Sequence, residues 1–333
     1  MGDVGYVGSR GIRPLTNRNI NPALAIQGQP ATFGQDGRIL NAQFGHKSSN
    51  ICPTATNPSA PCKGWPDIGQ LIPFGNNYYD SLQAKLTRRL GHGSQIGFTY
   101  TFSKALDYED NEELGFLLWP TPSRYLLNRA LAGFDRTHNF EAYGVYTLPF
   151  GAGQRWAQNR IVSKLAGGWQ LGWVLSAMSG TPFTVTDGNG SILNAPGSTQ
   201  VPDIVAPIRI LNGQPQASSC SPSLSCYYFD PSSFQHVTTP HVFGNARRNI
   251  LRGPGYFDLD MSLNRDFKLS ERFTFQLQAQ AFGVTNTPHF NNPTNDRNSS
   301  TFGRVTSTLV TTNASLGGSG GQRQWWFGGK LIF

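Results

Sequence analysis

The last eleven residues, Arg323 to Phe333, constrain the fold more than any other stretch of the chain. Successive side chains of a β-strand point to opposite faces. In this stretch one face carries four apolar side chains: Trp325, Phe327, Leu331 and Phe333. Chain ends are usually polar and poorly ordered, whereas this one stays apolar and aromatic to its final residue. The pattern predicts a terminal β-strand with one apolar face. An ordinary soluble β-sandwich can end on such a strand as well.

Composition favours strands and turns throughout the chain. Glycine (38), proline (22), phenylalanine (22) and tyrosine (11) are abundant among the 333 residues, and only 14% of residues are charged. The mean hydropathy is −0.34, and no stretch approaches the ~18 consecutive apolar residues of a transmembrane helix. A strand that crosses a membrane needs only ~9–11 residues of alternating character, so a membrane location stays open.

The chain is basic, with a formal net charge of +8 and a pI of about 9.5. Its lysine and arginine residues are scattered and form no dense run. A solvated lumen or loop surface accounts for this pattern better than a nucleic-acid site does, so we predict no nucleic-acid partner.

Seven earlier segments alternate apolar and polar residues in the same way. They are residues 4–9, 78–90, 95–103, 140–150, 169–185, 257–264 and 273–281. The fifth is predicted to continue through Ser179–Pro182 to Val185. With the terminal segment they give about eight strands, and a helical turn is predicted near residues 124–131.

The connections between these segments alternate in length. Short turns fall at 91–93, 151–168 and 268–271, and long stretches at 10–77, 107–137, 187–255 and 286–322. If Phe333 ends at the periplasmic side, every short turn lies on that side and every long stretch on the other. This sorting is typical of outer-membrane barrels, and a soluble sandwich gives no reason for it. We therefore predict an all-β, antiparallel transmembrane β-barrel, partial at about eight strands, with long extracellular loops and short periplasmic turns.

In such a barrel the apolar faces meet lipid and the polar faces line a lumen. The predicted lumen-facing polar row comprises Asp258, Asp260, Asn264, Gln276, Gln278 and Gln280. Asp258 and Asp260 in phase also raise the possibility of a cation site, but the polarity of the whole face favours a lumen lining. Arg88 and Arg265 fall on apolar faces close to strand ends, where an arginine costs about 0–1 kcal/mol.

The four cysteines form two close pairs, Cys52 with Cys62 and Cys220 with Cys226, each in a stretch rich in polar residues and proline. Their spacing matches no zinc pattern. Two disulfide-closed loops in an oxidising compartment are the preferred interpretation; four free thiols are the alternative.

No catalytic motif is present, and we predict no catalytic residue, cofactor site or metal site. An acidic cluster at residues 107–113 is compatible with Ca²⁺ binding, but its spacing is not that of an EF-hand. A solvated loop is the preferred interpretation.

Several short blocks, in order along the chain, resemble the C-terminal part of TonB-dependent receptors related to Oar, which are abundant in Acidobacteria. The blocks are Tyr6–Gly11, Tyr100–Asp107, Tyr146–Gly151, Gly167–Leu171, Ser179–Phe183, Phe229–Phe234, Phe243–Ala246, Arg252–Gly255 and Ala281–Asn286. Each block is weak alone; the ordered series is more specific.

The resemblance implies an outer-membrane transporter that takes up a scarce solute through a plugged barrel of ~22 strands. The chain departs from that pattern because it shows no export signal, no plug and no TonB-contacting segment. We therefore expect residues 1–333 to be the C-terminal barrel segment of a longer receptor. The implied partners are outer-membrane lipid, the remaining strands and plug, the TonB complex through those parts, and the barrel-assembly machinery through the terminal strand.

Two other hypotheses stay open. One is a free-standing small outer-membrane barrel that acts in binding or adhesion through its outer loops. The other is a secreted, carbohydrate-binding β-sandwich, which would be soluble without detergent.

Overall fold

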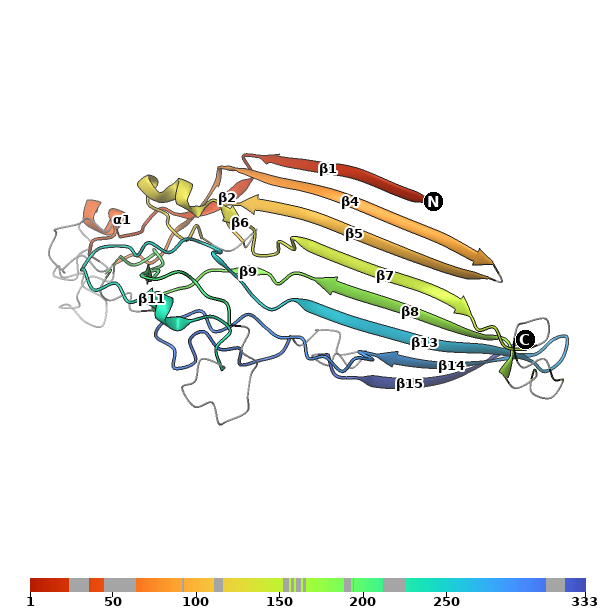
Figure 1. Ribbon diagram of the computed structural model, residues 1–333. Helices are drawn as coiled ribbons and strands as arrows, with labels where there is room; N and C mark the ends of the chain where they lie inside the picture. The colour runs from red at the N-terminus through yellow and green to blue at the C-terminus, as the bar shows by residue number, and fades with distance from the viewer. Residues whose placement is uncertain are drawn as a thin grey trace, which may run out of the picture.

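The computed structural model is dominated by one large antiparallel sheet of long strands (Figure 1). It describes residues 1–23, 36–44, 64–91, 93–110, 116–151, 156, 159, 163, 166–188, 193, 195–211, 226–309 and 321–333.

Within these described residues the sheet follows the order β1-β4-β5-β7-β8-β13-β14-β15, and a short strand, β6, pairs with β5 beside β7. The long strands are β1 (Gly2–Ile12), β4 (Asn76–Gly91), β5 (Ser94–Asp107), β7 (His138–Thr147), β8 (Trp169–Met178), β13 (Tyr256–Lys268), β14 (Thr274–Phe282) and β15 (Gln324–Ile332). Each neighbouring pair is antiparallel, so the sheet is a meander in chain order. The predicted all-β, antiparallel architecture is confirmed.

The connections are sorted by length between the two ends of the sheet. The β4–β5 turn uses Gly91 and Gly93, both with positive φ (82° and 75°), a conformation that glycine adopts without steric cost. The β13–β14 turn spans residues 269–273 at the same end, where the chain also terminates (Figure 1). The described parts of the four long connections lie at the opposite end (Figure 1). We call this the loop end.

The long connections contain short elements of their own. These are β2 (Leu15–Asn19) paired with β3 (Gly69–Pro73), α1 (Ile39–Gln43), the 3₁₀ turn η1 (Pro122–Asn128), β6 (Ala130–Leu131), β9 (Pro182–Phe183) paired with β12 (Leu251–Arg252), β10 (Asp203–Ile204) paired with β11 (Phe234–Gln235), and the 3₁₀ turn η3 (Pro231–Ser233). The helical turn predicted near residues 124–131 corresponds to η1.

The strand predicted to run unbroken from Trp169 to Val185 is wrong in its second half. β8 ends at Met178, and β9 leaves the large sheet to pair with β12. At this bend a Cβ on Gly180 would lie 1.8 Å from the carbonyl oxygen of Gly253. Two chain segments therefore come too close for the strand to continue straight.

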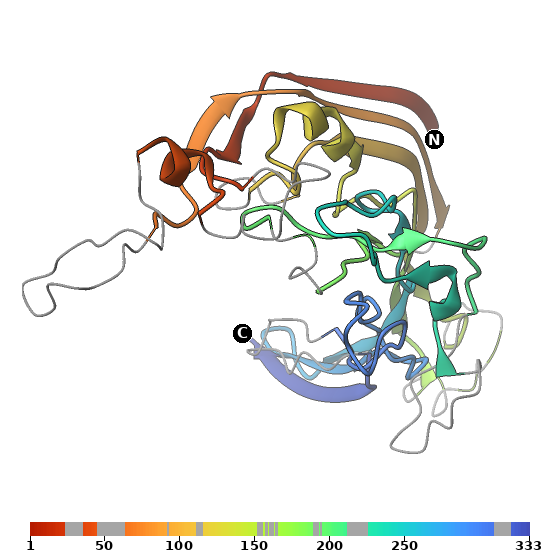
Figure 2. The ribbon, with the colours of Figure 1, turned by 90° about the vertical axis from the view of Figure 1, so that its left-hand side faces the viewer.

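The sheet is bent into an arc when viewed along its strands, and loop segments lie within the arc (Figure 2). The polar face of the sheet is the one turned toward the loops, because the Ser103 hydroxyl donates to the Arg136 carbonyl at 2.9 Å. β1 and β15 form the two edges, and no pairing joins them among the described residues. No helix in the described part of the chain is long and apolar enough to cross a membrane.

Candidate functional site at the loop end

The register places the predicted polar row on one face of β13 and β14. Asn264 lies opposite Gln278, and Gln276 and Gln280 oppose Asp266 and Ser262. Asp258 and Asp260 continue the same face of β13, opposite Ser176 and Val174 of β8. The structure thus brings the six residues of the row onto one surface; their role as a lumen lining stays a prediction.

The terminal strand, β15, carries its predicted apolar side chains on the opposite face of the sheet from the polar row. Trp325, Phe327 and Leu331 lie opposite Ala281, Ala279 and Phe275 of β14, on the apolar face. Phe333 follows β15 directly, and all four aromatic or aliphatic side chains are exposed. Arg265, also on the apolar face, is buried with its guanidinium 4.3 Å from the Phe267 ring centroid, which accounts for a charge at that position.

The polar face is less uniformly polar than the sequence predicts. Tyr143 and Val145 of β7 and Val174 of β8 share it, and Val174 is 51% exposed. A Cβ on Gly97 would meet the Tyr143 ring at 2.5 Å, so this glycine makes room for the tyrosine. The face therefore carries an apolar patch beside its polar row.

The long connections are packed together around two buried clusters. The first contains Ala23, Trp119, Leu193, Ala195, Val201, Phe243 and Ala246. The second contains Phe183, Val185, Phe229, Phe234, Leu251 and Phe302. Because their members come from all four long connections, the loops form one body. The sequence suggested irregular stretches because these contacts lie far apart along the chain.

A buried arginine joins this body to the sheet. Arg248 donates to the carboxylates of Asp107 and Asp110, and to the backbone carbonyl oxygens of Asp107 (3.1 Å) and Asn128. The Arg248 and Asp107 side chains are only 4% and 6% exposed. Burial lowers the pKa of Arg248, but the two carboxylates raise it more, so the guanidinium stays charged.

This contact corrects the prediction of a solvated acidic loop. Asp107 and Asp110 are occupied by Arg248, more than a hundred positions away in sequence, and Asn249 adds donors to Asp110 and to the Leu131 carbonyl (2.7 Å). Glu112 and Glu113 lie outside the described residues. Among those described, no group of three or more His, Cys, Asp or Glu side chains is arranged to hold a metal ion.

A second arginine, Arg252, joins β12 to the β5–β7 connection. It donates to the Asp135 carboxylate, the Thr137 hydroxyl (2.6 Å) and the Gly180 carbonyl (2.9 Å). Two of the blocks that carry the family resemblance, Ser179–Phe183 and Arg252–Gly255, therefore pack on each other. Their glycines allow close packing: a Cβ on Gly180 would meet the Gly253 carbonyl oxygen, and a Cβ on Gly253 would meet the Asn292 side-chain amide.

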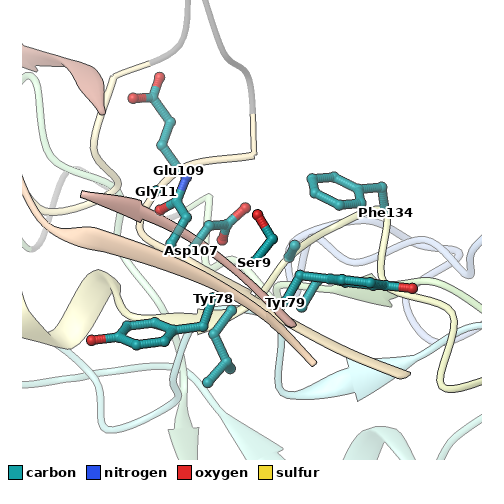
Figure 3. A pocket seen from close by; sticks show the side chains of 11 residues that line it. Ser9, Gly11, Tyr78, Tyr79, Asp107, Glu109 and Phe134 are labelled. Atoms are coloured by element: carbon teal, nitrogen blue, oxygen red, sulfur yellow. The ribbon is translucent and has the colours of Figure 1, made fainter. Parts of the chain in front are cut away.

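A pocket of about 370 Å³ opens where the loop body meets β1, β4 and β5 (Figure 3). Its walls include Ser9, Asn77, Tyr79, Asp107, Glu109 and Phe134. Tyr78 and Tyr79 point in opposite directions from adjoining positions of β4, and Tyr79 extends toward Phe134 in this view. A second cavity of about 250 Å³ shares Asn77 and Glu109 with the first. Aromatic walls with a few polar groups are typical of small-molecule sites.

Glu109 is the titratable group between the two cavities. Its Oε2 accepts the backbone N–H of Asn17 at 3.2 Å, and burial raises the pKa of the carboxyl group to about 7. At neutral pH this side chain is therefore partly protonated and can both donate and accept a hydrogen bond.

The predicted disulfides fall largely on undescribed residues. Cys226 is disulfide-bonded, whereas Cys52, Cys62 and Cys220 lie outside the described part of the chain. The pairings Cys52–Cys62 and Cys220–Cys226 stay predictions.

Comparison with known families gives the class of protein. The family model described as "Outer membrane beta barrel domain" matches residues 1–324, nearly the whole chain. The chain belongs to this family, and its location is the bacterial outer membrane. Searches of curated proteins and of solved structures find no significant match.

Sequence reasoning did not find Arg248, Arg252 or Glu109. The arginines stand in a glycine- and asparagine-rich stretch without periodicity, so nothing local marks them as buried. Glu109 was seen only as one member of an acidic cluster. The available signal was the resemblance block Arg252–Gly255, whose structural partner the sequence does not reveal.

Proposed function

We propose that this chain is the barrel segment of a TonB-dependent receptor and takes part in the uptake of a scarce solute across the outer membrane. The observation that carries the proposal is the pocket on the polar face, at the end of the sheet where the long connections pack into one body. Its loop residues, Glu109, Ala132 and Phe134, come from the β5–β7 connection. A packed loop body beside an inner-face pocket provides a binding site at the entrance of a barrel. The proposed role is binding and passage, without a catalytic step.

The edges of the sheet support a larger barrel. β1 is exposed along its whole length, and β15 along nearly all of it. Unpaired backbone groups in hydrocarbon cost several kcal/mol each, so both edges take partners in the membrane. We propose that further receptor strands supply them, that a plug fills the lumen and contacts TonB, and that β15 is the strand presented to the barrel-assembly machinery.

The size of the native polypeptide tests this arrangement. An antibody against residues 187–255 is used to probe outer-membrane fractions. A band far above 36.4 kDa is expected. A membrane band near that mass would instead indicate a free-standing barrel, and signal confined to the soluble fraction would contradict a membrane role altogether.

Depletion of solutes from the growth medium tests uptake. Cells with the native protein are compared with cells carrying Tyr79→Ala and Phe134→Ala, which remove two aromatic walls of the pocket. We expect at least one solute to be depleted only by the native cells, and a protonophore to abolish that depletion. Equal depletion by both strains would refute the role of the pocket.

A further inference from the structure

The apolar face of β4 and β5 ends sharply toward the loop end. Leu86 and Leu82 of β4 and Phe98 and Phe102 of β5 are exposed on this face, where the register aligns them in pairs. The next outward positions are Asp80 and Lys104, which oppose each other directly. This change from apolar to charged side chains marks the boundary between hydrocarbon and headgroups.

Three basic side chains gather at and just beyond this boundary. We call Arg10, Lys104 and Arg129 the outward basic cluster; all three are exposed. The guanidinium carbons of Arg10 and Arg129 lie 5.4 and 5.2 Å from the centroid of the same ring, that of Tyr78. Lys104 is on the same face, two positions along β5 from Leu106, the residue opposite Tyr78.

The three cations outnumber the one carboxylate in this patch, that of Asp80. Asp80 accepts a hydrogen bond from the hydroxyl group of Tyr6. No salt bridge between described residues includes Arg10, Lys104 or Arg129. The patch therefore keeps a net positive charge. Lys104 and Tyr78 are in register with the apolar face of the sheet, although Tyr78 also borders the pocket.

We propose that the outward basic cluster binds the phosphate groups of an anionic lipid headgroup in the outer leaflet. Guanidinium groups form paired hydrogen bonds with phosphate oxygens, and the Tyr78 ring holds two of them in place. The long loops of outer-membrane barrels lie on the extracellular side, so the cluster is at the level of outer-leaflet headgroups. A transported solute is a poor alternative occupant because the cluster is on the lipid-facing side of the sheet.

Native mass spectrometry of the native polypeptide that carries this chain, released from nanodiscs, tests this proposal. The nanodiscs contain equal amounts of diphosphorylated lipid A and dephosphorylated lipid A in phosphatidylcholine. We expect the native protein to retain the diphosphorylated form preferentially. In a triple variant, Arg10→Gln, Lys104→Gln and Arg129→Gln, the preference should fall at least tenfold, because each basic residue at a membrane surface strengthens binding to anionic lipids.

A matched variant removes three exposed charges at the other end of the sheet: Arg88→Gln, Lys268→Gln and Arg272→Gln. It should keep the preference of the native protein. Equal retention of the two lipids by the native protein, or equal losses in the two triple variants, would overturn the proposal. Chymotrypsin resistance of the sheet checks that each variant is folded, because none of the substitutions changes an aromatic or leucine cleavage site.

A double variant, Arg10→Lys and Arg129→Lys, separates charge from geometry. It keeps the charge and loses the planar guanidinium groups beside Tyr78. We expect an intermediate preference. A preference as low as that of the Gln triple variant would show that charge at these positions does not hold the phosphate.

Discussion

Replacing Arg248 tests whether the loop body is held to the sheet by one buried ion pair. In Arg248→Gln the Asp107 carboxylate, 6% exposed, loses its cation while it stays buried. Removing one partner of a buried pair costs about 3–5 kcal/mol. Asp110 is 37% exposed and can be hydrated instead, so we expect the lower end, about 3 kcal/mol.

Amide hydrogen exchange measures this loss locally, in detergent micelles or nanodiscs. The reporters are the backbone N–H groups of Ala246 and Gly253, which donate to Pro202 (3.1 Å) and Thr181 (3.0 Å). A loss of about 3 kcal/mol corresponds to opening that is roughly 100-fold more frequent, at about 1.4 kcal/mol per factor of ten. Exchange of the strand amides of β4 and β5 should stay unchanged.

The control is Arg209→Gln, in the same long connection. Arg209 is 67% exposed and lies 4.0 Å from Asp230, and exposed pairs contribute about 0–1 kcal/mol. Exchange should therefore rise less than about fivefold. If both variants exchange at the same rate, Arg248 does not hold the loop body. Adding Asp107→Asn to Arg248→Gln should restore part of the protection, because the uncompensated charge disappears.

Three further predictions follow from other parts of the loop end. Gly180→Ala places a Cβ 1.8 Å from the Gly253 carbonyl oxygen and should lower the free energy of local unfolding by about 1–3 kcal/mol. Gly328→Ala should leave it unchanged, because no atom lies within 4 Å of the added Cβ. Thermal unfolding of the two variants compares these effects. Burial raises the pKa of Glu109 from 4.5 to about 7, so between these pH values the folded state keeps a proton that the unfolded chain releases. The free energy of unfolding should therefore fall as the pH rises through this range. Glu109→Gln should abolish this pH dependence, as measured by hydrogen exchange at pH 5 and pH 7.5. Peptide mapping without reduction should recover Cys226 linked to Cys220; a link to another cysteine would refute that pairing.

The large sheet was predictable because each of its strands is marked by a pattern within its own short stretch of sequence. Alternation between polar and apolar residues marks each long strand, and lengths of connections fix which end each turn occupies. β15 shows this most clearly, since Trp325, Phe327 and Leu331 fall on the predicted face. Errors arose where a distant segment decides the outcome, as at Gly180, where contact with Gly253 ends the strand that alternation alone would extend.

The loop end was not predictable in the same way. Its stability comes from contacts such as Arg248 with Asp107, 141 positions apart, and from side chains in segments without periodicity. The pocket depends on the same contacts, because Phe134 and Glu109 are brought to β1 by a folded connection. A single sequence gives residue types there but not their neighbours.

The shared packing of the long connections also sets the order in which the protein can fold. The first buried cluster joins Ala23 to Ala246, and the second joins Phe183 to Phe302. The first cluster cannot be complete until the chain has been synthesised through Ala246, and the second until it has been synthesised through Phe302, which follows β14. Contacts between such distant segments form late in folding. Protease resistance of the loop end would therefore report that the segments from Ala23 to Phe302 have come together.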